Sequence, residues 1–184
     1  MKRRIILIIL ALTMSLGLSA QSFTLGTNIL GYLNFATINA ELSYTFAKKW
    51  SLHLQTKVNP FTFNNNKENQ MQNRQASVSF GARLWPWHTN SGWFVGSSLE
   101  GGYYNIGGIV DAETKQGYKY GLNMYFGYTI MLAKHLNLEL GAGFITAYTN
   151  YTTYSCPKCG REVSKDKKII VSANNILAQL VYIF

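Results

Sequence analysis

The stretch NNILAQLVYIF, residues 174–184, ends the chain and decides its fold. In an extended strand, successive side chains point to opposite faces, so residues two apart share a face. One face of this stretch carries only apolar or aromatic side chains: Ile176, Ala178, Leu180, Tyr182 and Phe184. The stretch therefore predicts a final strand with one continuous apolar face, and the rest of the chain must supply its neighbours.

Seven further segments show the same period of two, and turn-forming residues separate them. In the segment 38–46, the odd positions are polar and the even ones apolar or aromatic: Ile38, Ala40, Leu42, Tyr44 and Phe46. Such alternation is typical of strands with one apolar face. The chain is thus predicted to be all-β, with eight strands at 23–30, 38–46, 50–58, 76–84, 92–104, 118–130, 136–148 and 174–184.

The connections between these segments alternate in length. Those after the second, fourth and sixth segments are short, whereas those after the third, fifth and seventh are long and polar. Short turns at one end and longer loops at the other are typical of an antiparallel up-and-down transmembrane β-barrel, and an even strand number returns both chain ends to the turn side. The connection 31–37 has intermediate length and fits this pattern least well.

Aromatic residues give a second indication of a membrane barrel, which carries aromatic girdles at two levels. Trp50, Trp85, Trp87 and Trp93 all lie beside the predicted short turns. Tyrosines flank the long loops instead: Tyr103, Tyr104, Tyr118, Tyr148, Tyr151 and Tyr154. The alternative is a secreted soluble sandwich or a lipocalin-like barrel.

The N-terminus reads as an export signal. Lys2, Arg3 and Arg4 precede the apolar run 5–12, and small residues follow at 15–20. This run is shorter than the roughly 20 residues of a membrane-spanning helix, so we predict a signal peptide at 1–20 and a barrel domain at 21–184. A protein without a spanning helix must cross a membrane as a closed barrel.

Four motifs carry a resemblance to a known family: KKWSLHLQTKVNPF at 48–61, GGYYNIGGI at 101–109, YSCPKCG at 154–160 and VYIF at 181–184. They resemble a family of small Gram-negative outer-membrane barrels, catalogued as a domain of unknown function, in the OmpA/OmpX-like superfamily. The resemblance implies an eight-stranded barrel in the bacterial outer membrane, and a last strand that the assembly machinery recognises. It supplies no catalytic residues.

Eight strands enclose an interior that side chains can fill, so no open pore is expected. The period of two places charged and titratable residues of both signs inside: Glu41, His53, Lys57, Arg83, Glu100, Lys119 and Glu139. Because an unpaired buried charge is costly, these side chains should form a hydrogen-bonded plug. The alternative is a proton or ion path.

Catalysis is considered because some small outer-membrane barrels modify lipids with a Ser or His near the outer rim. His88 and His135 lie in predicted short turns, and no serine pairs with the inward His53 by sequence. A general base needs a nucleophile within hydrogen-bond reach. We therefore expect no enzyme and no cofactor, but a structural or loop-presenting barrel. A lipid-modifying enzyme or small-ligand carrier is the alternative.

The last long loop contains Cys156 and Cys159 in the motif CPKCG. An exported chain with an even number of cysteines favours a disulfide between them. Zinc is the alternative, but a structural site needs four ligands and would have to recruit Glu162, Asp166 or a second copy of the loop. Free thiols are the third interpretation.

The same predicted loop is basic, with Lys158, Arg161, Lys165, Lys167 and Lys168. These side chains predict contact with membrane lipid and with lipopolysaccharide phosphates, or else a solvated loop. No basic patch interleaved with aromatic residues accompanies them, so no nucleic-acid partner is expected. A surface protein partner and the oligomeric state stay open.

Overall fold

The computed structural model describes residues 23–63, 70–108, 113–158 and 160–184. Its secondary structure is one short helix and nine strands: β1 (Phe23–Asn28), α2 (Ile29–Leu33), β2 (Ile38–Ala47), β3 (Trp50–Asn59), β4 (Thr62–Phe63), β5 (Met71–Leu84), β6 (Gly92–Gly107), β7 (Thr114–Ala133), β8 (Leu136–Tyr154) and β9 (Glu162–Ile183). The predicted signal peptide at 1–20 lies outside the described residues. No helix in these ranges is long and apolar enough to cross a membrane.

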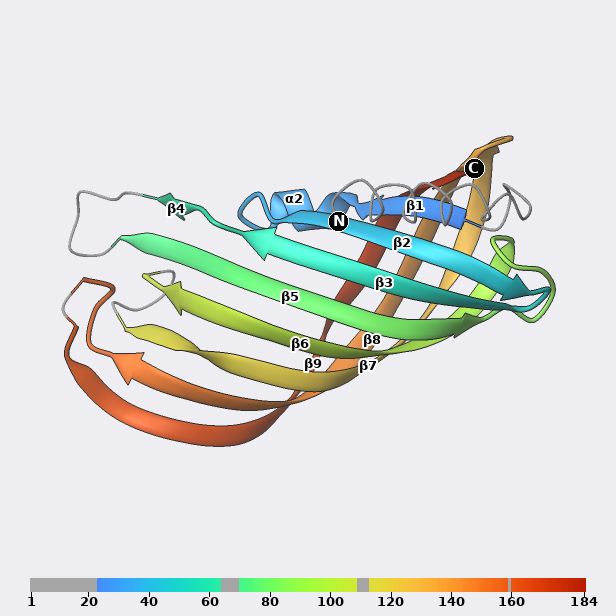
Figure 1. The fold of residues 1–184 in the computed structure, drawn as a ribbon. Coiled ribbons are helices and arrows are strands. Elements are labelled where there is room, and N and C mark those ends of the chain that lie inside the picture. The colour runs from blue at the N-terminus through green and yellow to red at the C-terminus, as the bar shows by residue number, and fades with distance from the viewer. Residues whose placement is uncertain (1–22, 64–69, 109–112, 159) are drawn as a thin grey trace, which may run out of the picture.

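The strands form a closed antiparallel barrel of eight strands (Figure 1). Neighbours in the chain pair in order, except that β3 pairs with β5 and the two-residue β4 only extends the edge of β5. The sheet closes where β1 pairs with β9, from Thr24 opposite Ile183 to Asn28 opposite Gln179. The predicted fold class is confirmed.

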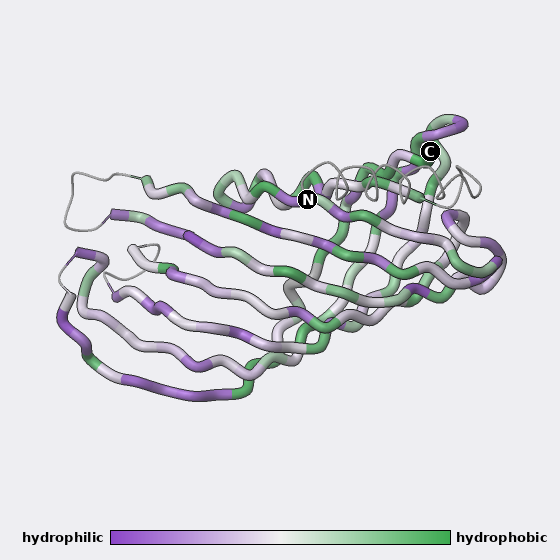
Figure 2. The backbone as a smooth tube through the Cα atoms, viewed as in Figure 1, coloured by the Kyte–Doolittle hydropathy of each residue, from purple (hydrophilic) through white to green (hydrophobic). Residues whose placement is uncertain are grey.

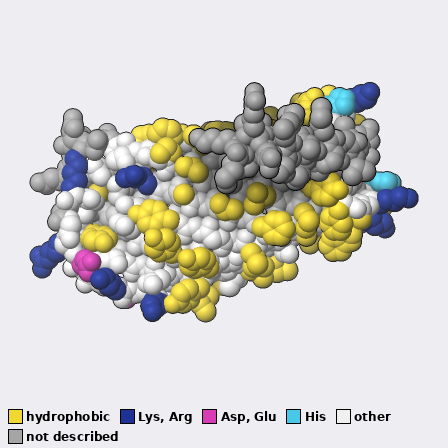
Figure 3. Space-filling model, in the orientation of Figure 1, with side chains coloured by type: hydrophobic (Ala, Val, Ile, Leu, Met, Phe, Trp, Pro, Cys, Tyr) yellow, Lys and Arg dark blue, Asp and Glu magenta, His cyan; other side chains and the backbone are white. Residues whose placement is uncertain are grey.

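The polarity of the barrel is apolar outside and polar inside. Outward side chains such as Leu99 and Ile169 are 68% and 71% exposed, whereas the inward Glu139 is 1% exposed. Figure 3 shows hydrophobic side chains across the middle of one face and basic side chains at both ends. This polarity is the reverse of a soluble sandwich, whose apolar side chains would fill its interior.

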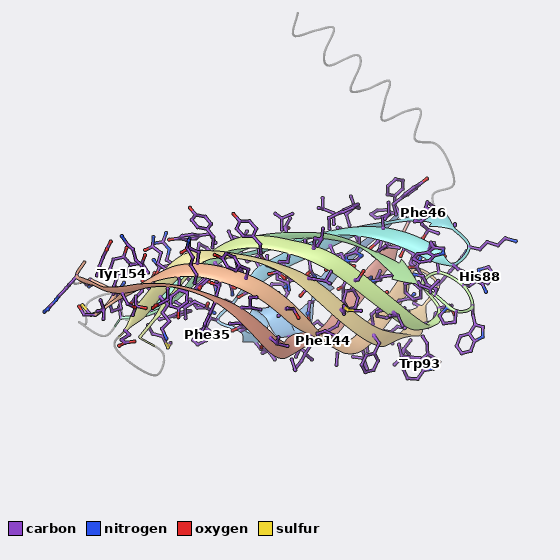
Figure 4. All side chains as sticks on the ribbon, turned by 90° about the horizontal axis from the view of Figure 1, so that it is seen from below. Phe35, Phe46, His88, Trp93, Phe144 and Tyr154 are labelled. Carbon is purple, nitrogen blue, oxygen red and sulfur yellow. The ribbon has the colours of Figure 1, made fainter. Side chains whose placement is uncertain are left out.

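The connections between strands are mostly shorter at one end of the barrel than at the other. We call "turn end" the end that holds the β2–β3, β5–β6 and β7–β8 turns, and "loop end" the other. Figure 4 shows Phe46, His88 and Trp93 at the turn end and Tyr154 at the loop end. The start of β1 and the end of β9 also lie at the turn end, as the even strand number predicts.

Several strands extend beyond the predicted segments at the loop end. β8 continues to Tyr154 and β9 begins at Glu162, so most of the connection 149–173 is strand. Threonine and tyrosine make up most of β8 here, and both favour extended backbone. Figure 2 shows that this half of β9 is largely hydrophilic, which is why an apolar period did not reveal it.

A break in the β8–β9 register also hid the strand. Gly143 pairs with Asn175, but Ile145 pairs with Ser172, so β9 carries an extra residue between the two pairs. A bulge of one residue exchanges the faces of everything beyond it. Ser172 therefore shares the inward face with the buried Ile145, and Val171 lies outside.

The first predicted strand ends earlier than expected. After Asn28 the chain turns into α2, and Asn28 Oδ1 accepts the N–H of Leu30 as the helix cap. The Asn39 side chain bonds both the N–H and the carbonyl of Asn28, at 2.6 and 2.9 Å. Asn28 Nδ2 in turn donates to the Ile176 carbonyl on β9 at 3.1 Å. Two asparagine side chains thus replace the strand ladder where β1 stops.

Candidate functional site

The turn-end half of the lumen is crossed by a buried ion cluster. Arg83 on β5 lies between two carboxylates: its Nη2 is 2.7 Å from Glu41 Oε1, and its Nη1 is 3.1 Å from Glu139 Oε2. All three side chains are at most 3% exposed. Since they come from β2, β5 and β8, the cluster ties opposite walls of the barrel together.

Uncharged side chains complete the cluster. Arg83 Nε donates to Tyr125 Oη at 3.2 Å, and that hydroxyl lies 3.0 Å from His53 Nε2. Gln179 Nε2 donates to Glu41 Oε1 at 2.9 Å. We call these six residues, Glu41, His53, Arg83, Tyr125, Glu139 and Gln179, the lumen plug. Only about 20 Å³ of space lies beside it, roughly enough for a water molecule.

Two aromatic rings lie below the plug towards the turn end. Trp85 and Phe94 are both 0% exposed, with ring centroids 4.9 Å apart, and the Arg83 guanidinium lies 5.3 Å from the Phe94 centroid. Trp85 Nε1 donates to Ser51 Oγ at 3.1 Å. The prediction that Trp85 belongs to an outer girdle is therefore wrong. Its ring fills the lumen, whereas Trp50, Trp87 and Trp93 are exposed.

Glycines make room for these rings. A Cβ at Gly96 would collide with the ring of Tyr125, and one at Gly127 would collide with the ring of Phe94. Both glycines occupy inward positions of β6 and β7. The aromatic layer thus needs the absence of side chains on the neighbouring strand.

The remaining predicted lumen residues lie farther towards the loop end. Lys119 Nζ is 2.7 Å from Glu100 Oε1, and Asn123 Nδ2 donates to Glu100 Oε2 at 3.0 Å. Lys57, half-buried on β3, forms no ion pair with any residue that the structure describes. Of the seven predicted residues, four belong to the plug, Glu100 and Lys119 form an ion pair, and Lys57 makes no direct ion pair within the described residues.

Beyond this ion pair the lumen opens into a cavity of about 460 Å³, which we call the loop-end cavity. Its polar lining includes Lys57, Gln75, Glu100, Lys119 and Asn123. Apolar side chains line another part of it: Leu30, Ile145, Ala147, Ile170 and Ile176. Its volume lies within the range of about 300–1,000 Å³ that small-molecule sites occupy.

Sequence reasoning missed two uncharged members of the site, Tyr125 and Gln179. Both occupy inward positions, but an uncharged polar side chain gives no sign in the sequence that it pairs with a buried ion. Alternation does assign Asn123 to the lumen, where the structure places it, although its bond to Glu100 was not predicted. Tyr104 was predicted for a girdle, but its hydroxyl hydrogen-bonds Thr149, which is 2% exposed inside the barrel.

None of the three histidine rings forms a hydrogen bond to a serine or cysteine side chain within the described residues; Ser43, which lies opposite His53, bonds Glu41 instead. The partner of His53 is the Tyr125 hydroxyl, and His135 Nδ1 lies 2.9 Å from the Ile183 carbonyl at the turn end. His88 is also at the turn end. The described ranges contain no cluster of three or more His, Cys, Asp or Glu side chains that could hold a metal ion.

The basic residues of the last loop are placed differently from the prediction. Lys165, Lys167 and Lys168 lie on β9, and only Lys158 and Arg161 lie in the tip between β8 and β9. The Glu162 carboxylate accepts a hydrogen bond from the Lys165 ammonium at 3.0 Å, which raises the pKa of Lys165. Cys156 is not a free thiol, but Cys159 lies outside the described residues, so the disulfide stays a prediction.

The chain matches one family over residues 5–184, described as Protein of unknown function (DUF3575). No curated protein and no solved structure matches it.

Proposed function

Since the chain belongs to the DUF3575 family, whose function is unknown, we propose a role from the barrel itself: a non-enzymatic outer-membrane protein, closed to diffusion, that presents its loop end outside the cell. One observation carries this proposal. The barrel combines an apolar outer face with a buried ion cluster across its lumen.

The outer face supports a membrane location. Exposed apolar side chains occur on all eight barrel strands, far more than the scattered exposed residues of a soluble monomer. In the membrane these side chains contact lipid, and a closed barrel satisfies its backbone groups between strands. The predicted signal peptide at 1–20 supplies the export, and we assign the barrel to the OmpA/OmpX-like superfamily.

The lumen supports a closed, non-catalytic barrel. Arg83, its carboxylate partners and the rings of Trp85 and Phe94 fill the turn-end half. The hydrogen-bond partner of His53 is Tyr125, and the serine opposite it, Ser43, bonds Glu41 rather than the imidazole that would have to activate it in a hydrolase.

The loop end supports surface presentation. β8 and β9 carry hydrophilic residues there, with the cysteine-containing tip between them. Lys165 and Lys167 are exposed on the outer side of β9, where lipopolysaccharide phosphates would be within reach of their ammonium groups. The second role proposed for this end is binding of a protein partner at the cell surface.

Two measurements test the proposal. The protein should sediment with outer-membrane markers and migrate as a heat-modifiable band. Purified protein in liposomes should release no trapped small dye above the level of empty liposomes. Location in the cytoplasmic membrane, or steady dye release, would refute the proposal.

A further inference from the structure

The hydrogen-bonded wall of the barrel has a gap at the loop end, where α2 follows β1: α2 lies against β9 but does not pair with it as a strand. β1 stops at Asn28 opposite Gln179, and the Asn28 side chain reaches as far as the Ile176 carbonyl. From there to Glu162, β9 pairs only with β8 within the described residues. Figure 1 shows this half of β9 diverging from β1 and β2. The edge of β9 thus borders an interruption of the hydrogen-bonded wall.

The loop-end cavity reaches this gap. Leu30 and Gly31 of α2 line it from one side, and Ile170 and Ser172 of β9 line it from the other. Ile176 also lines the cavity, although it belongs to the outward face and is 57% exposed. A residue that is shared by the cavity and the outer surface marks an opening between them.

The opening lies at the level of the apolar outer band. Val171 and Ile169, the outward residues of β9 beside the gap, are both 71% exposed. Tyr148, which pairs with Ile169, is also outward and exposed. Apolar side chains at this level face lipid in a membrane barrel, so the gap faces the outer leaflet.

One part of the cavity wall is apolar and another part is charged. The wall near the gap is apolar, and the inner part carries two lysines against one glutamate. Glu100 forms an ion pair with Lys119 at 2.7 Å and also attracts the Lys57 ammonium, which makes no direct ion pair within the described residues. Two ammonium groups thus share one carboxylate, and one positive charge is in excess in this part of the cavity. A cation in such a place favours an anionic oxygen on the ligand, because charge-assisted hydrogen bonds are the strong ones.

We propose that the loop-end cavity binds an amphiphile with one acyl chain and an anionic head group. The head group pairs with Lys57, the chain lies along Ile145, Ile170 and Ile176, and the molecule enters through the gap beside α2. The access route rests on the membrane location proposed above, whereas binding in the cavity does not. The plug stops the ligand from passing to the turn end, so the site is a blind pocket.

Binding of radiolabelled palmitate to the full protein in lipid nanodiscs tests the head-group site. Wild type should bind palmitate saturably, with one site per chain. Lys57→Gln should weaken binding about tenfold, because a hydrogen bond between charged groups is lost. Lys167→Gln, which removes an exposed outward lysine of β9, should change nothing. Methyl palmitate, which lacks the charge, should bind both Lys57 forms equally and more weakly than palmitate binds wild type.

A second pair of variants tests the chain site. Ser172→Phe should fill the cavity and abolish saturable binding, whereas Val171→Phe, on the opposite face of the same strand, should leave it intact. Heat-modifiable migration of each variant shows that it has folded. Lysophosphatidylglycerol as competitor identifies the source of the anion: displacement of palmitate shows that a lipid head group fits the site, and no displacement restricts the site to free fatty acids.

Absence of saturable palmitate binding to folded wild type would overturn the proposal. An unchanged affinity in folded Lys57→Gln or folded Ser172→Phe would overturn it as well. These results are separate from those on the proposed function, because dye release reports on the plug and sedimentation on location, and neither changes the affinity of the cavity in nanodiscs.

Discussion

The two halves of the lumen share one eight-stranded wall but differ in what fills it. At the turn end the inward positions carry large side chains such as Arg83, Phe94 and Tyr125, which leave about 20 Å³ of space. At the loop end the inward positions include Ser77, Gly121 and Ala147, and a cavity of about 460 Å³ remains. The size of the inward side chains therefore decides whether a small barrel is plugged or holds a ligand-sized cavity.

Removal of the central cation, Arg83, should lower the stability of the barrel more than any change in the loop-end half. Arg83→Ala leaves two buried carboxylates unpaired and should lower the free energy of unfolding by about 3–5 kcal/mol. Lys57→Ala in the loop-end half, which breaks no ion pair between described residues, should cost less than about 1 kcal/mol. Denaturant titration in lipid bilayers measures both values.

A combined variant separates unpaired charge from lost packing. Arg83→Met with Glu41→Gln and Glu139→Gln removes the charges while it keeps side-chain length, so it should recover most of the lost stability. If Arg83→Ala and Lys57→Ala cost the same, the plug does not stabilise the barrel more than the cavity wall does.

Arginine substitutions on β7 test which side chains of this strand face outward and which face the lumen. Leu122 is 43% exposed on the outside, and its neighbour Asn123 is 5% exposed inside. Leu122→Arg should destabilise by about 2–4 kcal/mol, because it places a charge in lipid. Asn123→Arg, beside the cavity, should be milder. Equal unfolding free energies for the two variants would show that the faces are assigned wrongly.

Asn28→Ala tests whether the loop-end half of the barrel opens independently of the turn-end half. It removes the α2 cap and the bond to the Ile176 carbonyl, which should cost about 1–3 kcal/mol. Hydrogen exchange should rise in α2 and in the loop-end half of β9, but not at Arg83 or Glu139. Uniformly faster exchange throughout the barrel would mean that the two halves do not open independently.

The smallest effect is expected at the tip of the loop end. The predicted Cys156–Cys159 disulfide closes a very short loop, so Cys156→Ser with Cys159→Ser should cost about 2 kcal/mol at most. Mass spectrometry of unreduced protein after thiol alkylation tests the pairing. Two alkylated cysteines without bound metal would remove both the disulfide and the zinc interpretation.

The sequence predicted the barrel better than the cavity. A period of two identified the inward Glu41, Arg83 and Glu139, because apolar neighbours mark the outward face of each strand. It did not extend β9 to Glu162, since the apolar pattern stops there and the bulge near Ser172 exchanges the faces.

The cavity depended on features that alternation does not encode. The early end of β1 at Asn28 comes from side-chain hydrogen bonds between residues 11 positions apart, not from a local breaker such as proline. The position of the Trp85 side chain could not be predicted either, because a tryptophan beside a turn can lie in the lumen or in an outer girdle. Its place follows from the space that Gly127 leaves for Phe94.

Thiol labelling of intact cells tests the central claim, a lumen sealed at the turn end and accessible from the loop end. Single cysteines are introduced as Gln75→Cys in the cavity wall and Ser51→Cys below the plug, in a chain whose own cysteines are replaced by serine. A membrane-impermeant maleimide added outside should label Gln75→Cys and leave Ser51→Cys unlabelled until the protein is unfolded. Labelling of Ser51→Cys in intact cells, or protection of Gln75→Cys, would contradict the account.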